Sequence, residues 1–232
     1  MPSPNIPSDQ FDSIPSCIES FRNGEFLLVL DDPGRENEGD LIIAAQDVTT
    51  EQMGWMIRHS SGYICVPMPS DRATALDLPP MVANTQDPRG TAYTVSVDAE
   101  HPLTTTGISA HDRALSCRTL ADPKSTPANL RRPGHVLPLR SVSGGVRARN
   151  GHTEAATEFC RLAGKEPVAA ICEIVDDTEE VPGQAILPGA KMMTGEGCIR
   201  FARKWNIKVC TIADLITHVE KTEGKLPSNG SA

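Results

Sequence analysis

The sequence predicts a single mixed α/β domain, in which helices pack on the faces of a mixed, twisted sheet. Short apolar runs that are typical of strands alternate with amphipathic stretches that are typical of helices along the chain. No internal repeat, low-complexity block or convincing linker divides the 232 residues. A chain of this length can bury a substantial core as one domain. We expect that domain over residues 13–222, between disordered tails at 1–12 and 223–232.

Strands are predicted wherever a short run is apolar or alternates between apolar and polar residues. Turn residues separate the first two of these runs, with Pro33-Gly34 and Gly39 lying between them. Residues 167–175 form the longest apolar run. The predicted strands span 26–31, 40–46, 63–68, 93–98, 135–139, 167–175 and 207–210.

Helices are predicted from amphipathic spacing and from residues that begin or end a helix. Ser109, followed by Asp112 three residues later, resembles a capping box. Thr153 is the expected N-cap of another helix, which Gly164 ends. The predicted helices span 14–22, 50–58, 109–120, 153–163, 194–205 and 212–221.

Composition excludes several classes of protein. A net charge of -8 and a pI near 5.3 argue against nucleic acid as a partner, because phosphate binding needs a broad basic surface. No apolar run approaches the length of a membrane span, so no membrane partner is expected. The seven cysteines are odd in number and none forms a CxxC pair, which favours free thiols in a reducing, cytoplasmic compartment. Cys65 is interpreted as a strand residue rather than a nucleophile.

The most informative segment is the acidic loop, which we define as residues 31–40. It holds five carboxylates and one arginine between two predicted strands. Crowded carboxylates repel each other, and oxygen-rich clusters suit a hard divalent cation such as Mg²⁺. A solvated acidic turn is the alternative interpretation.

A basic segment provides the opposite charge. Residues 123–153 contain one lysine, five arginines and no acidic residue. They end at Arg149 and Thr153, beside a predicted helix start where free backbone N–H groups could hold a phosphate. An ordinary capped helix with surface arginines is the alternative. Together the two segments favour a metal-dependent enzyme acting on a phosphorylated small molecule.

Five motifs resemble 3,4-dihydroxy-2-butanone 4-phosphate synthase of riboflavin biosynthesis, in order from about residue 14 to 221. One departure is Tyr93, where that family more often has phenylalanine. The motifs are Asp32-Pro-Gly-Arg-Glu-Asn-Glu-Gly-Asp40, Thr94-Val-Ser-Val-Asp98, Thr105-Thr-Gly-Ile-Ser109 with Asp112-Arg113, Pro133-Gly-His135, and Arg149-Asn-Gly-His-Thr-Glu154.

The resemblance implies a function and a set of site residues. The reaction would be the Mg²⁺-dependent (or Mn²⁺-dependent) conversion of D-ribulose 5-phosphate into L-3,4-dihydroxy-2-butanone 4-phosphate plus formate, in a homodimer with sites near the subunit interface. Glu36 and His152 would hold the metal, and His135 and Glu173 would be catalytic. Substrate contacts would come from Arg35, Glu36, Asp40, Thr105, Arg149, Asn150, Gly151, His152 and Thr153. The chain lacks the cysteine-rich second domain of the larger family members, so a monofunctional enzyme is expected.

Alternatives to this function and to two of these roles remain open. A metal-dependent sugar-phosphate isomerase or aldolase could use the same metal and phosphate sites. A Ca²⁺-binding module is a third reading, although the acidic loop lacks EF-hand spacing. His135 could be a turn residue, whereas Glu173 inside an apolar run is harder to explain without a functional partner.

Overall fold

The computed structural model describes residues 7–176, 178, 180–189 and 191–227, and the outer parts of both expected tails lie outside these residues. Seven strands form one mixed sheet, in the order β4-β5-β3-β6-β2-β1-β7. The strands are β1 (Leu27–Leu30), β2 (Gly39–Ala44), β3 (Cys65–Pro69), β4 (Val97–Ala99), β5 (Leu130–Ser141), β6 (Ala169–Glu173) and β7 (Lys208–Thr211). The predicted fold class is therefore confirmed.

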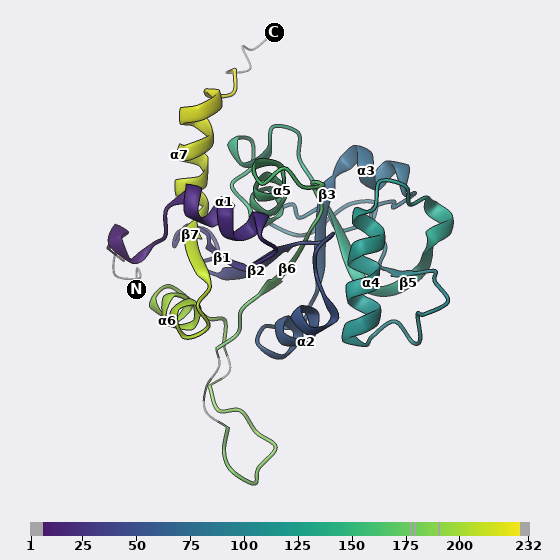
Figure 1. The fold of residues 1–232 in the computed structure, drawn as a ribbon, viewed down its shortest axis with the longest axis horizontal. Helices are drawn as coiled ribbons and strands as arrows, with labels where there is room; N and C mark the ends of the chain where they lie inside the picture. The colour runs from purple at the N-terminus through teal and green to yellow at the C-terminus, as the bar shows by residue number, and fades with distance from the viewer. Residues whose placement is uncertain (1–6, 177, 179, 190, 228–232) are drawn as a thin grey trace.

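Helices cover both faces of this sheet (Figure 1). One face carries α1 (Ile14–Arg22), α5 (His152–Leu162) and α7 (Ile212–Glu223), and the other carries α2 (Thr50–Arg58), α3 (Ser70–Ala75), α4 (Ala110–Ala121) and α6 (Glu196–Lys204). Short 3-10 helices occupy Ser8–Gln10, Pro127–Asn129 and Gly145–Arg147.

The alternation of side chains along β1 and β2 explains the two cores. Leu28 and Leu41 face the α2/α4/α6 side, whereas Leu27 and Ile42 face the α1/α5/α7 side. Successive strand residues point to opposite faces, so covering both faces buries every residue of these strands. All seven cysteines are buried and free, as the sequence predicted.

Strand pairing assembles one end of the sheet from segments that are distant in sequence. β1 and β2 are antiparallel and are joined by most of the acidic loop. β2 is also antiparallel to β6, and its register sets Asp40 directly opposite Glu173. β6 in turn contacts β3 through the pair Ile171 and Cys65. The start of α5 packs against this same end.

Several predicted elements differ in the structure. Residues 93–98 form isolated bridges at Tyr93 and Thr94 before a three-residue strand at 97–99, rather than one strand. β5 is much longer than the predicted 135–139, because it pairs with β3 along one edge and β4 along the other. The six-residue α3 was not predicted; it follows β3 directly and has no side-chain cap.

The N-terminal segment makes specific contacts before the expected start of the domain. Asp12, within residues 1–12, accepts hydrogen bonds from Arg203 at 2.7 Å, Lys208 at 3.0 Å and the backbone N–H of Val209 at 2.9 Å. Phe11 packs against the hydrophobic core on the face that carries α2, α4 and α6. No helix among the described residues is long and apolar enough to cross a membrane.

Candidate active site

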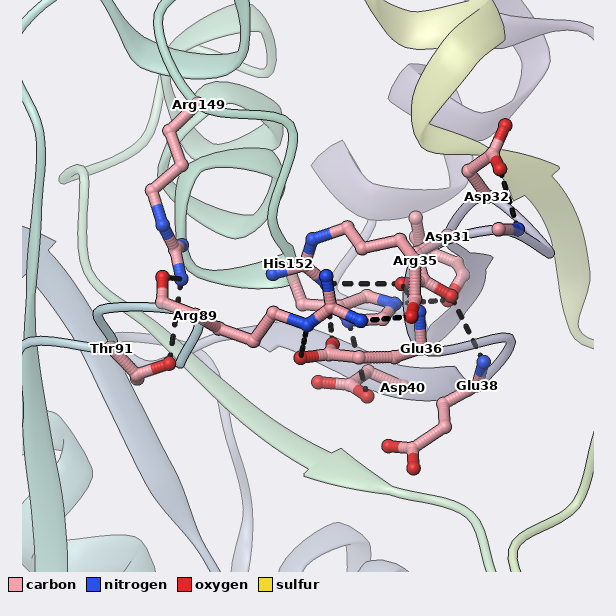
Figure 2. A network of polar contacts seen from close by, with 12 residues as sticks. Asp31, Asp32, Arg35, Glu36, Glu38, Asp40, Arg89, Thr91, Arg149 and His152 are labelled. Carbon is pink, nitrogen blue, oxygen red and sulfur yellow. Dashed lines mark hydrogen bonds and ion pairs between the residues drawn. The ribbon is translucent and has the colours of Figure 1, made fainter. Parts of the chain in front are cut away.

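The acidic loop is organised by the buried carboxylate of Asp31. Its Oδ1 accepts the backbone N–H of Glu38 at 2.9 Å, and its Oδ2 accepts that of Glu36 at 3.0 Å. The same Oδ2 accepts a hydrogen bond from Arg35 Nη1 at 3.0 Å. Asp31 therefore folds the loop so that Glu36 and Glu38 turn into the cavity beneath it, whereas Asp32 bonds Gly34 and points away (Figure 2).

That cavity, of about 180 Å³, is where most predicted site residues meet. It lies between the acidic loop, the start of α5 and the ends of β2, β3 and β6. Seven of the predicted residues line it, namely Arg35, Glu36, Asp40, Arg149, His152, Thr153 and Glu173. Asn150 lines a wider opening next to it, together with Arg35, Arg89 and Arg149.

Asp40 is the least satisfied group in the cavity. Its side chain is buried, and its Oδ1 has no hydrogen-bond partner in the structure. Burial, followed by the charges of Glu173, Glu38 and Glu36, raises the pKa of Asp40 well above its usual range. A buried carboxylate oxygen without a donor is costly, so this position favours the binding of a positive group.

His152 faces Asp40 from the first turn of α5. Its Nε2 lies 3.0 Å from the carbonyl oxygen of Val29, and a carbonyl can only accept, so Nε2 carries the proton. Its Nδ1 lies 3.6 Å from Asp40 Oδ1. Burial lowers the pKa of His152, which favours the neutral ring. A neutral imidazole with its Nδ1 lone pair turned towards a carboxylate is suited to bind a metal ion.

Glu36 lies on the cavity wall, but arginines hold its carboxylate. Arg35 Nη1 bonds one oxygen, and Arg89 Nε lies 3.7 Å from the other (Figure 2). Among the described residues, no three His, Cys, Asp or Glu side chains converge into a ready-made metal cage. A hard cation that keeps most of its water needs only one or two protein ligands, which Glu36 and His152 could supply.

Arg149 reaches the cavity mouth from the segment before α5. Its Nη1 donates to the buried carboxylate of Glu154 at 2.6 Å, and its Nη2 donates to the carbonyl of Arg89 at 3.2 Å (Figure 2). A Cβ at Gly151 would overlap the Arg149 guanidinium, so a larger residue there would displace that side chain from its present position. Gly151 is also the N-cap of α5; the prediction that Thr153 caps this helix was wrong, because the helix begins at His152.

Glu173 closes the opposite wall of the cavity. Ser61 Oγ donates to Glu173 Oε2 at 3.1 Å, and the backbone N–H of Ser61 donates to the Glu173 carbonyl at 2.8 Å. Tyr93 and Cys65 complete this wall, where burial raises the pKa of both side chains. Cys65 is therefore held as a neutral thiol, in keeping with its interpretation as a strand residue.

Thr105 and His135 lie elsewhere. Neither lines the cavity, and His135 is four residues from the cavity-lining Leu139, about 13 Å along an extended strand. Thr105 Oγ1 donates to Asp112 Oδ2 at 2.6 Å, and His135 Nδ1 lies 2.8 Å from Asp98 Oδ2. The predicted site residues thus form two groups in one chain.

Sequence reasoning missed several cavity residues. Arg89, Thr91 and Asp87 come from the loop at 78–91. The unusual length of this loop is typical of an active-site lid, and its Gly90-Thr91 pair supplies a hydroxyl near a strand end, but nothing in the sequence singled out Arg89 or Asp87. Glu38 was counted only as part of the acidic cluster. Nothing in the local sequence indicated that Asp98 would contact His135.

The fold and cavity define an α/β protein with a small polar site, in which acidic and imidazole groups face a basic mouth. Such a site suits a divalent cation together with a phosphorylated small molecule. The family model described as 3,4-dihydroxy-2-butanone 4-phosphate synthase matches residues 15–218. The chain belongs to this family.

Individual relatives agree with this assignment over all or most of the chain. The 3,4-dihydroxy-2-butanone 4-phosphate synthase of Pyricularia oryzae is 67% identical over 232 residues and is matched over 100% of both chains. A solved structure of such a synthase in complex with two magnesium ions superposes with a TM-score of 0.91 at 68% identity, covering 93% of this chain and 100% of that one. A cation-free structure gives a TM-score of 0.88 at 66% identity, covering 92% and 100%.

Proposed function

We propose that this protein converts D-ribulose 5-phosphate into L-3,4-dihydroxy-2-butanone 4-phosphate and formate, supplying a four-carbon unit for riboflavin. The observation that carries the proposal is the cavity in which the unsatisfied Asp40 oxygen faces His152 Nδ1 below a mouth of three arginines. Family membership supports the reaction class.

The residues present fit a Mg²⁺ ion, and Glu36 and His152 would hold it. Their donor set is one carboxylate and one neutral imidazole, and Asp40 adds a buried carboxyl group beside them, which a bound cation would favour in its ionised form. When bound, the ion would polarise a ketone or hydroxyl oxygen and so acidify the neighbouring C–H bond. One of the solved relatives is described as a complex with two magnesium ions, which supports this choice of metal.

The arginines at the mouth would bind the substrate phosphate. Arg35, Arg89 and Arg149 surround the opening that also includes Asn150. Arg35 and Arg149 already hold carboxylates, so a phosphate would join existing ion pairs rather than meet free charges. Holding the phosphate at the mouth would direct the sugar carbons towards Asp40, His152 and Glu173.

Glu173 and His135 would carry protons during the reaction. The substrate must lose a proton from C3, expel the C1 hydroxyl as water, undergo a carbon shift, take up water and release C4 as formate. The two waters cancel, so a five-carbon phosphate yields a four-carbon phosphate and formate. Glu173 lines the cavity and can exchange protons there directly.

A homodimer would bring His135 to the reaction. In one chain His135 and Thr105 lie outside the cavity that contains Glu173. A two-fold interface presents the same surface from both subunits, so His135 of one protomer could reach the cavity of its partner. We also propose a cytoplasmic location without nucleic-acid partners, supported by the seven free thiols and the acidic pI.

The decisive experiment is a product assay with purified protein, ribulose 5-phosphate and Mg²⁺. Equal amounts of formate and a four-carbon phosphate are expected from the wild type, and almost none from Glu173→Gln. A five-carbon isomer or a triose product without formate would instead identify an isomerase or aldolase and refute the proposal.

A further inference from the structure

Arg89 connects the two charged segments of the candidate site. Its Nε lies 3.7 Å from Oε1 of Glu36, and its guanidinium also donates to the carbonyl oxygen of Arg35, so the side chain reaches into the acidic loop (Figure 2). The carbonyl oxygen of Arg89 accepts a hydrogen bond from Arg149 at 3.2 Å. One residue of the loop at 78–91 therefore contacts both the proposed metal loop and the proposed phosphate segment.

A tight turn presents Arg89 at this position. Asp87 Oδ2 accepts the backbone N–H of Thr91 at 2.6 Å, and the Asp87 carbonyl oxygen accepts that of Gly90 at 3.0 Å. Gly90 has a φ of +66°, which glycine adopts at little steric cost. The Arg89 side chain is 41% exposed. The turn thus fixes the backbone of Arg89, whereas its long side chain can change rotamer.

Arg35 and Arg89 hold the Glu36 carboxylate unequally. Arg35 bonds Oε2 of Glu36, and it is fixed in place because its side chain is 12% exposed and also bonds the buried Asp31. Oε1 of Glu36 faces Arg89 across a longer and more exposed contact. A partly exposed ion pair of this kind contributes little free energy, so Oε1 is the oxygen that Glu36 can give to a cation at low cost.

A cation on Oε1 and the ion pair with Arg89 exclude each other. A guanidinium 3.7 Å from this oxygen would lie within a few ångströms of a divalent ion bound to it, where like charges repel. Glu36 must therefore release Arg89 when it takes the ion. The released guanidinium lies at the opening that Arg149 and Asn150 also line, where a phosphate would meet charge-assisted donors.

We propose that Arg89 competes with the metal ion for Glu36 and, once displaced, binds the substrate phosphate, so that the two ligands strengthen each other's binding. This inference rests on the proposed function, in which Glu36 holds Mg²⁺ and the arginines bind phosphate. Either ligand alone must break the Arg89–Glu36 pair, whereas both together break it only once. Each ligand should therefore raise the affinity for the other by the same factor.

The test uses Mg²⁺ and inorganic phosphate as probes in isothermal titration calorimetry of the intact protein. Each probe is titrated alone and in the presence of the other, in the wild type and in Arg89→Ala. Arg89→Ala should bind Mg²⁺ alone about 2- to 5-fold more tightly, the range expected for one partly exposed ion pair, because the competitor for Glu36 is gone. The factor by which Mg²⁺ strengthens phosphate binding should fall by that same amount. Pairing of Mg²⁺ with phosphate in solution is common to both proteins and cancels in this comparison.

Arg149→Ala is the matched control, because Arg149 lines the same opening but pairs with Glu154 instead of Glu36. This variant should bind phosphate more weakly. Its affinity for Mg²⁺ alone, and the factor by which the two ligands strengthen each other, should stay at the wild-type values. A second measurement needs only the wild type: Mg²⁺ alone should shift the NMR signal of the Arg89 Nε–H group, which is identified by its loss in Arg89→Ala.

Three results would overturn the proposal. An unchanged Mg²⁺ affinity in Arg89→Ala would show that Arg89 does not compete for Glu36. An equal gain in Mg²⁺ affinity in Arg89→Ala and Arg149→Ala would assign the effect to general charge. An unchanged coupling factor in Arg89→Ala would show that the displaced guanidinium does not reach the phosphate. A wild-type protein that releases no formate would refute the proposed function, while these titrations would still decide whether Arg89 couples the two ligands.

Discussion

Asp40 Oδ1 and His152 Nδ1 face each other at 3.6 Å, and the oxygen has no hydrogen-bond partner. A strand and a helix start produce this relationship, since Asp40 is the second residue of β2 and His152 is the first residue of α5. The pair presents an imidazole lone pair and a buried carboxyl group to the same small cavity, and a bound cation would favour the ionised form of that carboxyl. A cation would satisfy both groups, which explains why a carboxylate is retained at a buried position beside Glu173.

The first prediction concerns metal binding. Glu36→Gln and His152→Ala should each weaken Mg²⁺ binding, measured by isothermal titration calorimetry, and remove Mg²⁺-dependent turnover, because each deletes one of few protein ligands. Asp32→Asn is the matched control, since Asp32 belongs to the same loop but only accepts the N–H of Gly34. Equal loss in all three variants would mean that general negative charge, and not these two ligands, attracts the ion.

The second prediction concerns the phosphate. Losing a charge-assisted contact costs about 1.5–3 kcal/mol, so Arg149→Ala should raise KM for ribulose 5-phosphate by about 10- to 100-fold. The variant should also melt earlier, because Glu154 is then a buried carboxylate without its partner. Arg147→Ala is the control, since Arg147 bonds Glu223 and the Gly224 carbonyl instead. An unchanged KM in Arg149→Ala would indicate that Arg35 and Arg89, rather than Arg149, bind the phosphate.

The third prediction tests whether His135 acts across a dimer. His135→Ser and Glu173→Gln should each be nearly inactive alone. Each site would combine Glu173 of one protomer with His135 of the other. Refolding an equal mixture of the two variants should then restore about a quarter of wild-type turnover. Half of the dimers formed would contain one copy of each variant, and one of the two sites in each of those dimers would be intact. If mass spectrometry detects mixed dimers but turnover does not recover, both residues must act in a site formed by one chain.

The fourth prediction concerns the glycine above His135. Gly107→Ala and Gly164→Ala both place alanine at a positive φ, +92° and +71°, and this backbone strain by itself should lower the free energy of unfolding by about 1 kcal/mol in each variant. Only at Gly107 would the new Cβ overlap Asp98, whereas Gly164 has open space. Turnover should therefore fall in Gly107→Ala alone. Similar kcat in both variants would argue against any dependence of the reaction on the Asp98–His135 contact.

The fifth prediction concerns acid stability. Burial alone would raise the pKa of Asp12, but hydrogen bonds from Val209, Arg203 and Lys208 outweigh it, so the pKa lies below its ordinary value of 3.8. A carboxylate whose pKa is lower in the folded state stabilises the fold at pH values above its unfolded-state pKa. This contribution to stability disappears as the pH falls through the folded-state pKa. Asp12→Asn should thus reduce the free energy of unfolding at pH 7 and have little effect near pH 2. Urea unfolding at both pH values measures the stability difference between wild type and Asp12→Asn, with Asp9→Asn at an exposed position as the control. A stability difference that is the same at both pH values would contradict the prediction.

Local sequence was sufficient where local interactions decide the structure. α1 and α2 begin and end at the predicted residues, because Ser13 and Thr49 cap them and amphipathic spacing defines their buried faces. The helix after Ser109 also begins as predicted, although Asp112 uses its carboxylate to hold Thr105 and Gly107 instead of closing a capping box. The length of β5 was not predictable, because it depends on partners at both edges.

By itself, the sequence determined the α/β class, the acidic loop, the basic segment before α5 and, through its motifs, the family. These follow from residue type and spacing, which are local properties of the chain. Only the tertiary structure decided that Asp40 lies opposite Glu173, that Nδ1 of His152 faces Asp40, and that His135 sits on Asp98 away from the cavity. Strand register and the bulge between β4 and β5 set these contacts, and both depend on pairing between segments that are far apart in sequence.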